Sequence, residues 1–82
     1  MKNMKKNNVT IYSTPTCHYC FKAKDYLKEN GIEFKEIDVS VDQRAAQEMI
    51  LKSGQMGVPV IEINSNIIVG FQPELISSLL TK

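Results

Sequence analysis

The two cysteines of this chain, Cys17 and Cys20, lie three positions apart, and the sequence contains no others. A disulfide that closes so short a loop does little to hold a chain of 82 residues together. Small domains that rely on disulfides carry more cysteines, spread along the chain. In redox proteins, one thiolate of such a pair attacks a disulfide and the second thiol resolves the mixed disulfide. The pair therefore indicates redox or metal chemistry rather than a structural crosslink.

The pair lies where a predicted strand ends and a predicted helix begins. Residues 9–13 alternate apolar and polar types and are rich in β-branched residues, residues 14–16 interrupt this pattern, and residues 18–30 suit a helix. The N–H groups and the dipole of a helix N-terminus favour a thiolate over a thiol. We therefore expect Cys17 to be the exposed nucleophile and Cys20, one turn further, to be the more buried resolving thiol.

A metal centre is the alternative use of the cysteine pair. Tetrahedral zinc needs four ligands, and the chain offers two cysteines and one histidine, His18, which we interpret as an exposed spacer. A complete zinc site within one chain is therefore not expected. An iron–sulfur cluster shared between two chains stays an alternative, because each chain could donate thiolates.

Further elements follow the first strand and helix. A second strand is predicted over 34–39, and Ser40 opens a second helix, where Ser40 and Gln43 match a capping box. Residues 58–63 and 67–69 predict an antiparallel hairpin around a turn, and Pro73 suits the first turn of a last helix. The expected apolar helix faces are Tyr19, Ala23, Tyr26 and Leu27, then Ala46, Met49, Ile50 and Ser53, and finally Leu75, Ile76, Leu79 and Leu80.

The element order β-α-β-α-β-β-α predicts an α/β fold with a mixed, four-stranded sheet. Three helices would flank this sheet, and between them they would cover both of its faces. The strand–helix–strand crossover implies a parallel pair, and the closing hairpin adds antiparallel strands. Residues 9–82 are expected to form a single domain after a flexible N-terminal tail, residues 1–8. The loop before the third strand would return near the cysteines. A cis Val58–Pro59 bond there would turn the backbone groups of Val58 outward, toward an extended substrate.

The composition narrows the functional classes. A net charge of +1 gives no support for nucleic-acid binding, which usually needs a strongly basic surface. The apolar runs are far shorter than a membrane span, and no apolar segment follows the N-terminal lysines as in a secretory signal. We therefore expect a cytoplasmic protein with neither a membrane nor a nucleic-acid partner.

The sequence resembles the glutaredoxins of the thioredoxin superfamily from about Val9 to Leu80. Residues 14–20, Thr-Pro-Thr-Cys-His-Tyr-Cys, are similar to the glutaredoxin motif Cys-Pro-Tyr-Cys with its preceding residues. Residues 57–60, Gly-Val-Pro-Val, resemble the Thr-Val-Pro segment of the family, and Gly70-Phe71 resembles the glycine turn before its last helix. Small bacterial and archaeal glutaredoxin-like proteins of the YruB type are the most similar group, and the redoxins that reduce ribonucleotide reductase are also similar.

The resemblance implies a thioredoxin-like fold and a dithiol thiol–disulfide oxidoreductase, with Cys17 as nucleophile and Cys20 as resolving thiol. It implies no metal and no tightly bound cofactor, with glutathione as reductant or co-substrate. The implied partners are glutathione and/or thioredoxin reductase and disulfide-containing protein substrates, and the protein is expected to be a monomer. The implied substrate or glutathione contacts are Tyr19, Gln55, Val58, Pro59, Gly70 and Phe71.

Two positions and one segment differ from the glutaredoxin pattern, and these differences leave the electron donor open. Thr14 stands where glutaredoxins commonly carry a lysine or arginine, with Lys22 as a partial substitute, and His18 replaces the usual proline. Residues 71–74 replace the glycine-and-aspartate cluster that binds the γ-glutamyl end of glutathione. This last segment is closer to the redoxins that thioredoxin reductase recharges.

Overall fold

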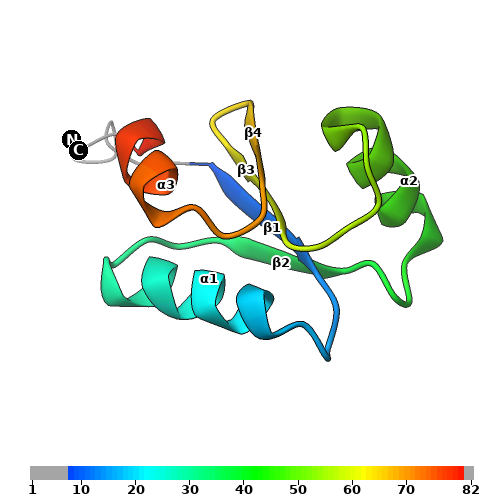
Figure 1. Ribbon diagram of the computed structural model, residues 1–82, viewed down its shortest axis with the longest axis horizontal. Helices are drawn as coiled ribbons and strands as arrows, with labels where there is room; N and C mark the ends of the chain where they lie inside the picture. The colour runs from blue at the N-terminus through cyan, green and yellow to red at the C-terminus, as the bar shows by residue number, and fades with distance from the viewer. Residues whose placement is uncertain (1–7, 81–82) are drawn as a thin grey trace.

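The computed structural model describes residues 8–80, and its seven elements follow the predicted order β-α-β-α-β-β-α (Figure 1). The elements are β1 (Val9–Ser13), α1 (His18–Glu29), β2 (Lys35–Asp38), α2 (Gln43–Ser53), β3 (Val60–Ile63), β4 (Asn66–Val69) and α3 (Pro73–Leu79). The tail expected over 1–8 lies outside the described residues except for Asn8. The backbone of Asn8 is hydrogen-bonded to Asn64 next to the β3–β4 turn.

The four strands form one mixed sheet in the order β2-β1-β3-β4, which confirms the predicted sheet. β1 runs parallel to β2, as α1 crosses over between them, whereas β3 is antiparallel to both β1 and β4. Because Tyr12 pairs with Val60, the start of β3 lies beside the end of β1. This register brings the Val58–Pro59 segment next to the loop that carries the cysteines.

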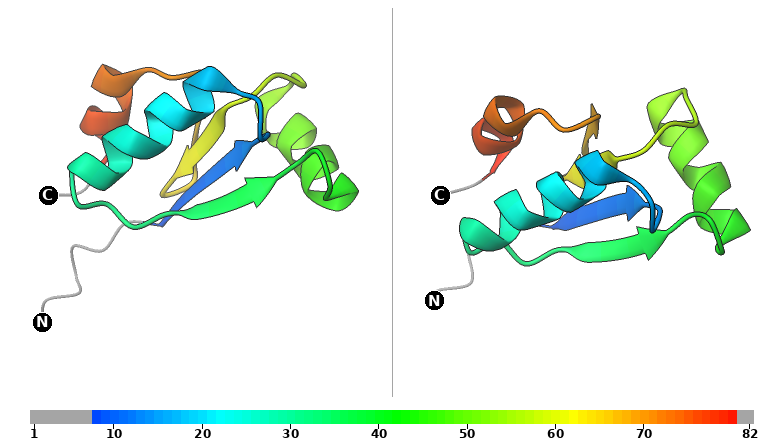
Figure 2. Two further views of the ribbon diagram at one scale, coloured as in Figure 1. Left: turned by 90° about the horizontal axis from the view of Figure 1, so that it is seen from below. Right: turned by 60° about the horizontal axis from the view of Figure 1, so that its bottom comes forward.

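Helices cover both faces of the sheet, as predicted (Figure 2). Side chains alternate along a strand, so Ile11 and Tyr12 of β1 point to opposite faces. Ile11 packs in a core with α1 and α3, whereas Tyr12 packs with α2. The first core consists of Val9, Ile11, Ala23, Leu27, Ile61, Ile63, Ile68 and Ile76, and the second of Tyr12, Ala45, Met49 and Val60. No helix within residues 8–80 is long and apolar enough to cross a membrane.

The apolar face of α1 differs from the expected one at its first turn. The spacing placed Tyr19 on the apolar face, but 60% of its surface is exposed, as a substrate contact would require. The helix instead buries Cys20, Ala23 and Leu27 completely. Spacings of three and four residues connect these three positions, and the helix turns Tyr19 about 100° away from Cys20. Tyr26 is half-buried against the core, as expected.

The buried faces of α2 and α3 also differ in part from the expected apolar faces. In α2, Ala45 and Met49 are buried, whereas Ile50, which was expected on the inner face, is exposed. In α3, Ile76 is the buried residue and Leu75 is exposed. The spacing of apolar residues allows either side of a helix to face inward, and the contact with the sheet selects one of them.

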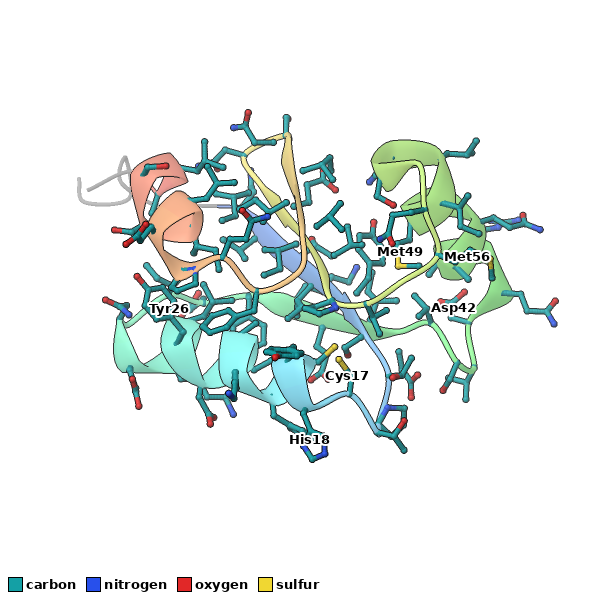
Figure 3. The ribbon with its side chains drawn as sticks, viewed as in Figure 1. Cys17, His18, Tyr26, Asp42, Met49 and Met56 are labelled. Carbon is teal, nitrogen blue, oxygen red and sulfur yellow. The ribbon has the colours of Figure 1, made fainter. Side chains whose placement is uncertain are left out.

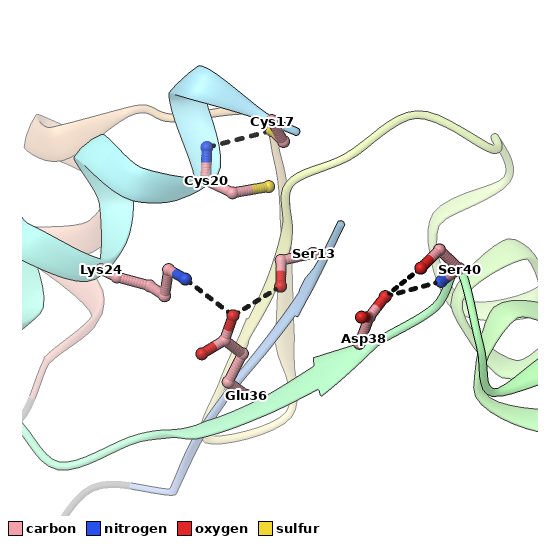
Figure 4. Close-up of polar contacts among 7 residues, drawn as sticks. All are labelled: Ser13, Cys17, Cys20, Lys24, Glu36, Asp38 and Ser40. Carbon is pink, nitrogen blue, oxygen red and sulfur yellow. Dashed lines mark hydrogen bonds and ion pairs between the residues drawn. The ribbon is translucent and has the colours of Figure 1, made fainter. Parts of the chain in front are cut away.

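The start of α2 was predicted at Ser40, and the structure corrects this to Asp42. The Asp42 Oδ1 atom accepts a hydrogen bond of 3.0 Å from the Ala45 N–H and caps the helix. Ser40 is not available as a cap, because its N–H and its hydroxyl both donate to the carboxylate of Asp38 at the end of β2 (Figure 4). The turn after β2 therefore uses Ser40, and the helix begins only after Asp42.

Replacement of Asp42 by alanine is expected to lower the free energy of unfolding by about 1 kcal/mol, because an N-cap side chain satisfies an otherwise unpaired helix N–H. Urea denaturation followed by circular dichroism measures the change. Ser40→Ala is the matched control and should have the smaller effect, since the Ser40 hydroxyl donates to Asp38 and does not cap the helix. A larger loss of stability for Ser40→Ala than for Asp42→Ala would contradict the assigned helix start.

Candidate active site

Cys17 is the N-cap residue of α1 and has an extended backbone conformation. Its Sγ atom accepts a hydrogen bond of 3.1 Å from the backbone N–H of Cys20 (Figure 4). The sulfur thus occupies the position that a serine or aspartate oxygen usually has at a helix start. No acidic residue lies in the first turn of α1 to oppose a negative charge there. The Cys17 sulfur therefore receives a backbone donor at the positive end of the helix dipole.

Both cysteines are free thiols, and they differ in accessibility. Cys17 is half-buried, less open than expected, whereas Cys20 is completely buried. Burial, together with the neighbouring Cys17 sulfur, raises the pKa of Cys20 to about 12. At neutral pH Cys20 is therefore a protonated thiol, and the more accessible Cys17 sulfur is the one available for a first attack.

The two residues between the cysteines point toward solvent. His18 extends away from the body of the protein and is exposed (Figure 3). Tyr19 is also exposed, and the Lys22 Nζ atom lies 5.3 Å from the centre of its ring. A cation at this distance from a ring is attracted to its face. Tyr19 and Lys22 thus form one exposed unit on the first turns of α1.

The Val58–Pro59 segment lies beside the cysteine loop, and its peptide bond is cis. Pro59 is buried, and its carbonyl oxygen accepts a hydrogen bond of 2.8 Å from the N–H of Gly70. Val58 is half-buried, and within residues 8–80 its backbone N–H and C=O form no hydrogen bond. Both groups of Val58 are therefore available to an extended chain that approaches Cys17.

Gly70 and Phe71 support this segment from the side of β4. Gly70 has a φ of 85°, a left-handed conformation that few other residues adopt, and so its N–H can reach Pro59. The Phe71 ring packs edge-on against Tyr26, with 6.0 Å between the ring centres, and contacts the first core. Phe71 therefore joins the β4–α3 connection to α1.

Gln55 is held within its own loop. Its Oε1 atom accepts a hydrogen bond from the Gly57 N–H and its Nε2 atom donates to the Gly57 carbonyl, both at 2.9 Å. A Cβ atom at position 57 would lie 2.9 Å from Gln55 Oε1, so a larger residue there would require the Gln55 side chain to shift. The side-chain amide of Gln55 thus has its partners inside the protein.

The sequence did not indicate a polar cluster that lies beneath Cys20. It consists of Ser13, Lys24 and Glu36, which come from β1, α1 and β2 (Figure 4). The four-residue spacing from Cys20 to Lys24 in the sequence could have predicted that these two residues share one face of α1. The position of Glu36 follows only from the pairing of β1 with β2. Within residues 8–80, no group of three or more potential metal ligands is gathered in one place.

Comparison with known proteins identifies the family. The glutaredoxin family model matches residues 9–68. An 8.6 kDa glutaredoxin-like protein of the rubredoxin operon of Clostridium pasteurianum is 49% identical over 74 residues, which cover 90% of this chain and 99% of that protein. Glutaredoxin 3 of Escherichia coli is 40% identical over 63 residues, 77% of this chain and 76% of that protein.

A solved structure, that of the glutaredoxin-like NrdH-redoxin from Escherichia coli, has the same fold. It superposes with a TM-score of 0.81 at 27% identity, over 92% of this chain and 97% of that one. The predicted thioredoxin-like fold is thereby confirmed. The family match, the relatives and the cysteine pair at the start of α1 agree, and the chain belongs to the glutaredoxin family of thioredoxin-fold redox proteins.

Proposed function

We propose that the protein is a dithiol thiol–disulfide oxidoreductase that reduces protein disulfides or glutathione mixed disulfides through Cys17 and Cys20. One observation carries this proposal: the half-buried Cys17 sulfur caps α1 and accepts the Cys20 N–H, while the Cys20 thiol lies buried one turn away. The arrangement provides one accessible nucleophile and one protected thiol, which are the two groups that dithiol exchange needs.

The reaction then proceeds in two exchanges. The Cys17 thiolate attacks one sulfur of the substrate disulfide and releases the first substrate thiolate, which takes a proton from water. Cys20 loses its proton, attacks Cys17 Sγ and releases the second substrate thiol. The substrate disulfide has gained two electrons, and Cys17 and Cys20 have lost them by forming their own disulfide. The high pKa of Cys20 keeps this thiol from competing in the first exchange.

The contacts of the neighbouring residues suggest how a substrate is held. We assign the substrate surface to the exposed ring of Tyr19 and to the unpaired backbone groups of Val58. Pro59, Gly70 and Phe71 hold this surface in place through the Pro59–Gly70 hydrogen bond and the Phe71–Tyr26 contact. We assign Gln55 the role of holding its own loop through the two hydrogen bonds between its amide and Gly57.

The same contacts support a proposal for the reductant. Thr14 carries no charge, and the Gln55 amide is already bonded to Gly57, so neither residue supplies a cation for a carboxylate of glutathione. A related protein, the Escherichia coli NrdH-redoxin, is described by its thioredoxin-like activity profile. We infer that thioredoxin reductase recharges the dithiol more efficiently than glutathione does. We further propose that the protein is a cytoplasmic monomer without a tightly bound cofactor.

A coupled assay tests this inference. The oxidised protein is offered either thioredoxin reductase or glutathione with glutathione reductase, and the consumption of NADPH is followed in both mixtures. The rate with thioredoxin reductase is expected to exceed the glutathione-linked rate at equal protein concentration. Consumption only in the glutathione mixture would overturn the choice of reductant but leave the dithiol chemistry intact. Consumption in neither mixture would contradict the oxidoreductase itself.

A further inference from the structure

Three polar side chains, Ser13, Lys24 and Glu36, form a cluster beneath the Cys20 thiol (Figure 4). The Glu36 Oε2 atom accepts two hydrogen bonds, one of 2.9 Å from the Ser13 hydroxyl and one of 2.7 Å from the Lys24 ammonium. Ser13 is the one polar residue that is buried within residues 8–80, at 1% exposure. A buried hydroxyl needs a partner, and Ser13 finds it in Glu36.

The fold directs these side chains toward Cys20 from three elements. Ser13 lies two residues after Ile11 on the same face of β1, and Glu36 pairs with Ile11, so both lie on the sheet face that α1 covers. Lys24 follows Cys20 by one helical turn on the same side of α1. The Lys24 side chain is 16% exposed and that of its partner Glu36 is 42% exposed, so the ion pair meets solvent on the Glu36 side.

The resolving step requires a negative charge at this buried position. Cys20 is protonated at neutral pH, and its sulfur must become a thiolate to attack the mixed disulfide. In the free dithiol the Cys17 sulfur opposes this charge, whereas the Thr14 backbone and Lys24 favour it. Once Cys17 is bonded to the substrate in a mixed disulfide its sulfur carries no charge, and the Thr14 backbone and Lys24 are the groups that remain. Glu36 adds a negative charge that Lys24 neutralises. Glu62 of β3 does not take part, because it pairs with Lys52 of α2 on the opposite face.

We propose that the Lys24 ammonium, held beneath α1 by the positioning residues Glu36 and Ser13, stabilises the Cys20 thiolate in the resolving step. This inference rests on the proposed dithiol mechanism. Cys20 gives its proton to water, and its sulfur bonds to Cys17 Sγ as the bond from Cys17 to the substrate sulfur breaks. The substrate sulfur leaves with the electron pair of that bond and is protonated as a thiol.

A stopped-flow reaction with the aromatic disulfide dithionitrobenzoate separates the two exchanges in one trace. Attack by Cys17 releases a first coloured thionitrobenzoate, and attack by Cys20 on the resulting mixed disulfide releases a second. Lys24→Met keeps an unbranched side chain of similar length but removes the charge, together with the contact of the ammonium with the Phe21 ring at 4.7 Å. If the Cys20 thiolate fraction falls tenfold, the second rate constant falls about threefold, because a more basic thiolate is also more nucleophilic. The first phase should change less than the second.

Matched variants distinguish a charge effect from a structural one. Lys28→Met removes the same charge one turn further along α1 and should leave the second phase near the wild-type rate. Lys24→Arg keeps the positive charge and should have a second phase near the wild-type rate. In the Lys24→Met protein Glu36 is left unpaired and opposes the thiolate, so adding Glu36→Gln should make the second phase faster again. Damage to the packing alone would not be relieved by a second substitution.

The possible outcomes lead to separate conclusions. A missing first phase in the wild type would contradict the proposed function. A normal first phase with an equal second phase in Lys24→Met and the wild type would overturn the role of Lys24 alone. A Lys24→Met/Glu36→Gln protein as slow as Lys24→Met would overturn it as well. Should Lys24→Met fail to fold by circular dichroism, Lys24→Gln, which retains a donor for Glu36, answers the same question.

Discussion

Replacement of Cys17 by serine is expected to reduce disulfide reductase activity by roughly 10²-fold or more, because the hydroxyl of serine is not ionised at neutral pH and cannot replace a thiolate. The expected loss concerns protein disulfides and glutathione mixed disulfides alike, since both begin with attack by Cys17. The initial rate of reduction of each substrate, measured with excess reductant, gives the effect. Retained reductase activity in Cys17→Ser would contradict the proposed function.

The fold should survive this substitution. Serine is a preferred N-cap residue, and its oxygen can accept the hydrogen bond that the Cys20 N–H gives to Cys17 Sγ. Thermal unfolding of Cys17→Ser should therefore differ little from that of the wild type. If Cys17→Ser is inactive but unfolds at the same temperature as the wild type, the loss of activity is due to the missing thiolate. If the variant is strongly destabilised, the loss of activity could not be attributed to the thiolate.

Replacement of Cys20 by serine is expected to separate the two kinds of substrate. Cys17 can still take glutathione from a mixed disulfide, and a second glutathione can release it again. A protein disulfide instead leaves the substrate attached to Cys17, because no internal thiol resolves the intermediate. We therefore expect near-normal glutathione exchange, a loss of protein disulfide reduction of roughly 10²-fold, and a trapped mixed disulfide in non-reducing mass spectra.

A serine hydroxyl in the buried site of Cys20 could itself disturb the protein, so Cys20→Ala is the matched control. Both variants should lose the same activity if the missing thiol is the cause. Normal reduction of both substrates by either variant would show that Cys20 does not resolve the intermediate.

The pH dependence of the resolving step follows from the burial of Cys20. Because burial raises the pKa of Cys20 to about 12, its thiolate fraction grows with pH throughout the neutral range. The rate of the second exchange in the wild type should therefore rise about tenfold for each pH unit between roughly pH 6 and 9. This rise belongs to Cys20, and in Cys20→Ser the second exchange should be missing at every pH in this range.

The order of elements and the sheet type were predictable because they depend on local patterns. Alternation over 9–13, the turn at 64–66 and Pro73 at the start of α3 each reflect a preference of the chain over a few residues. The start of α2 was not predictable in the same way. Ser40 and Asp42 both suit an N-cap, and Asp42 has this role because Asp38, at the end of β2, binds Ser40.

The sequence by itself determined that Cys17 and Cys20 lie one helical turn apart at the start of a helix, because this placement needs only the spacing of two residues and a local helix signal. It could not determine that Gln55 is bonded to Gly57 or that Glu36 and Lys24 meet beneath Cys20. These contacts depend on loop conformation and on the register of β1 with β2. Charged side chains on separate elements carry no sign of their partners until the sheet pairs, and only the tertiary structure decided which charge faces the resolving thiol.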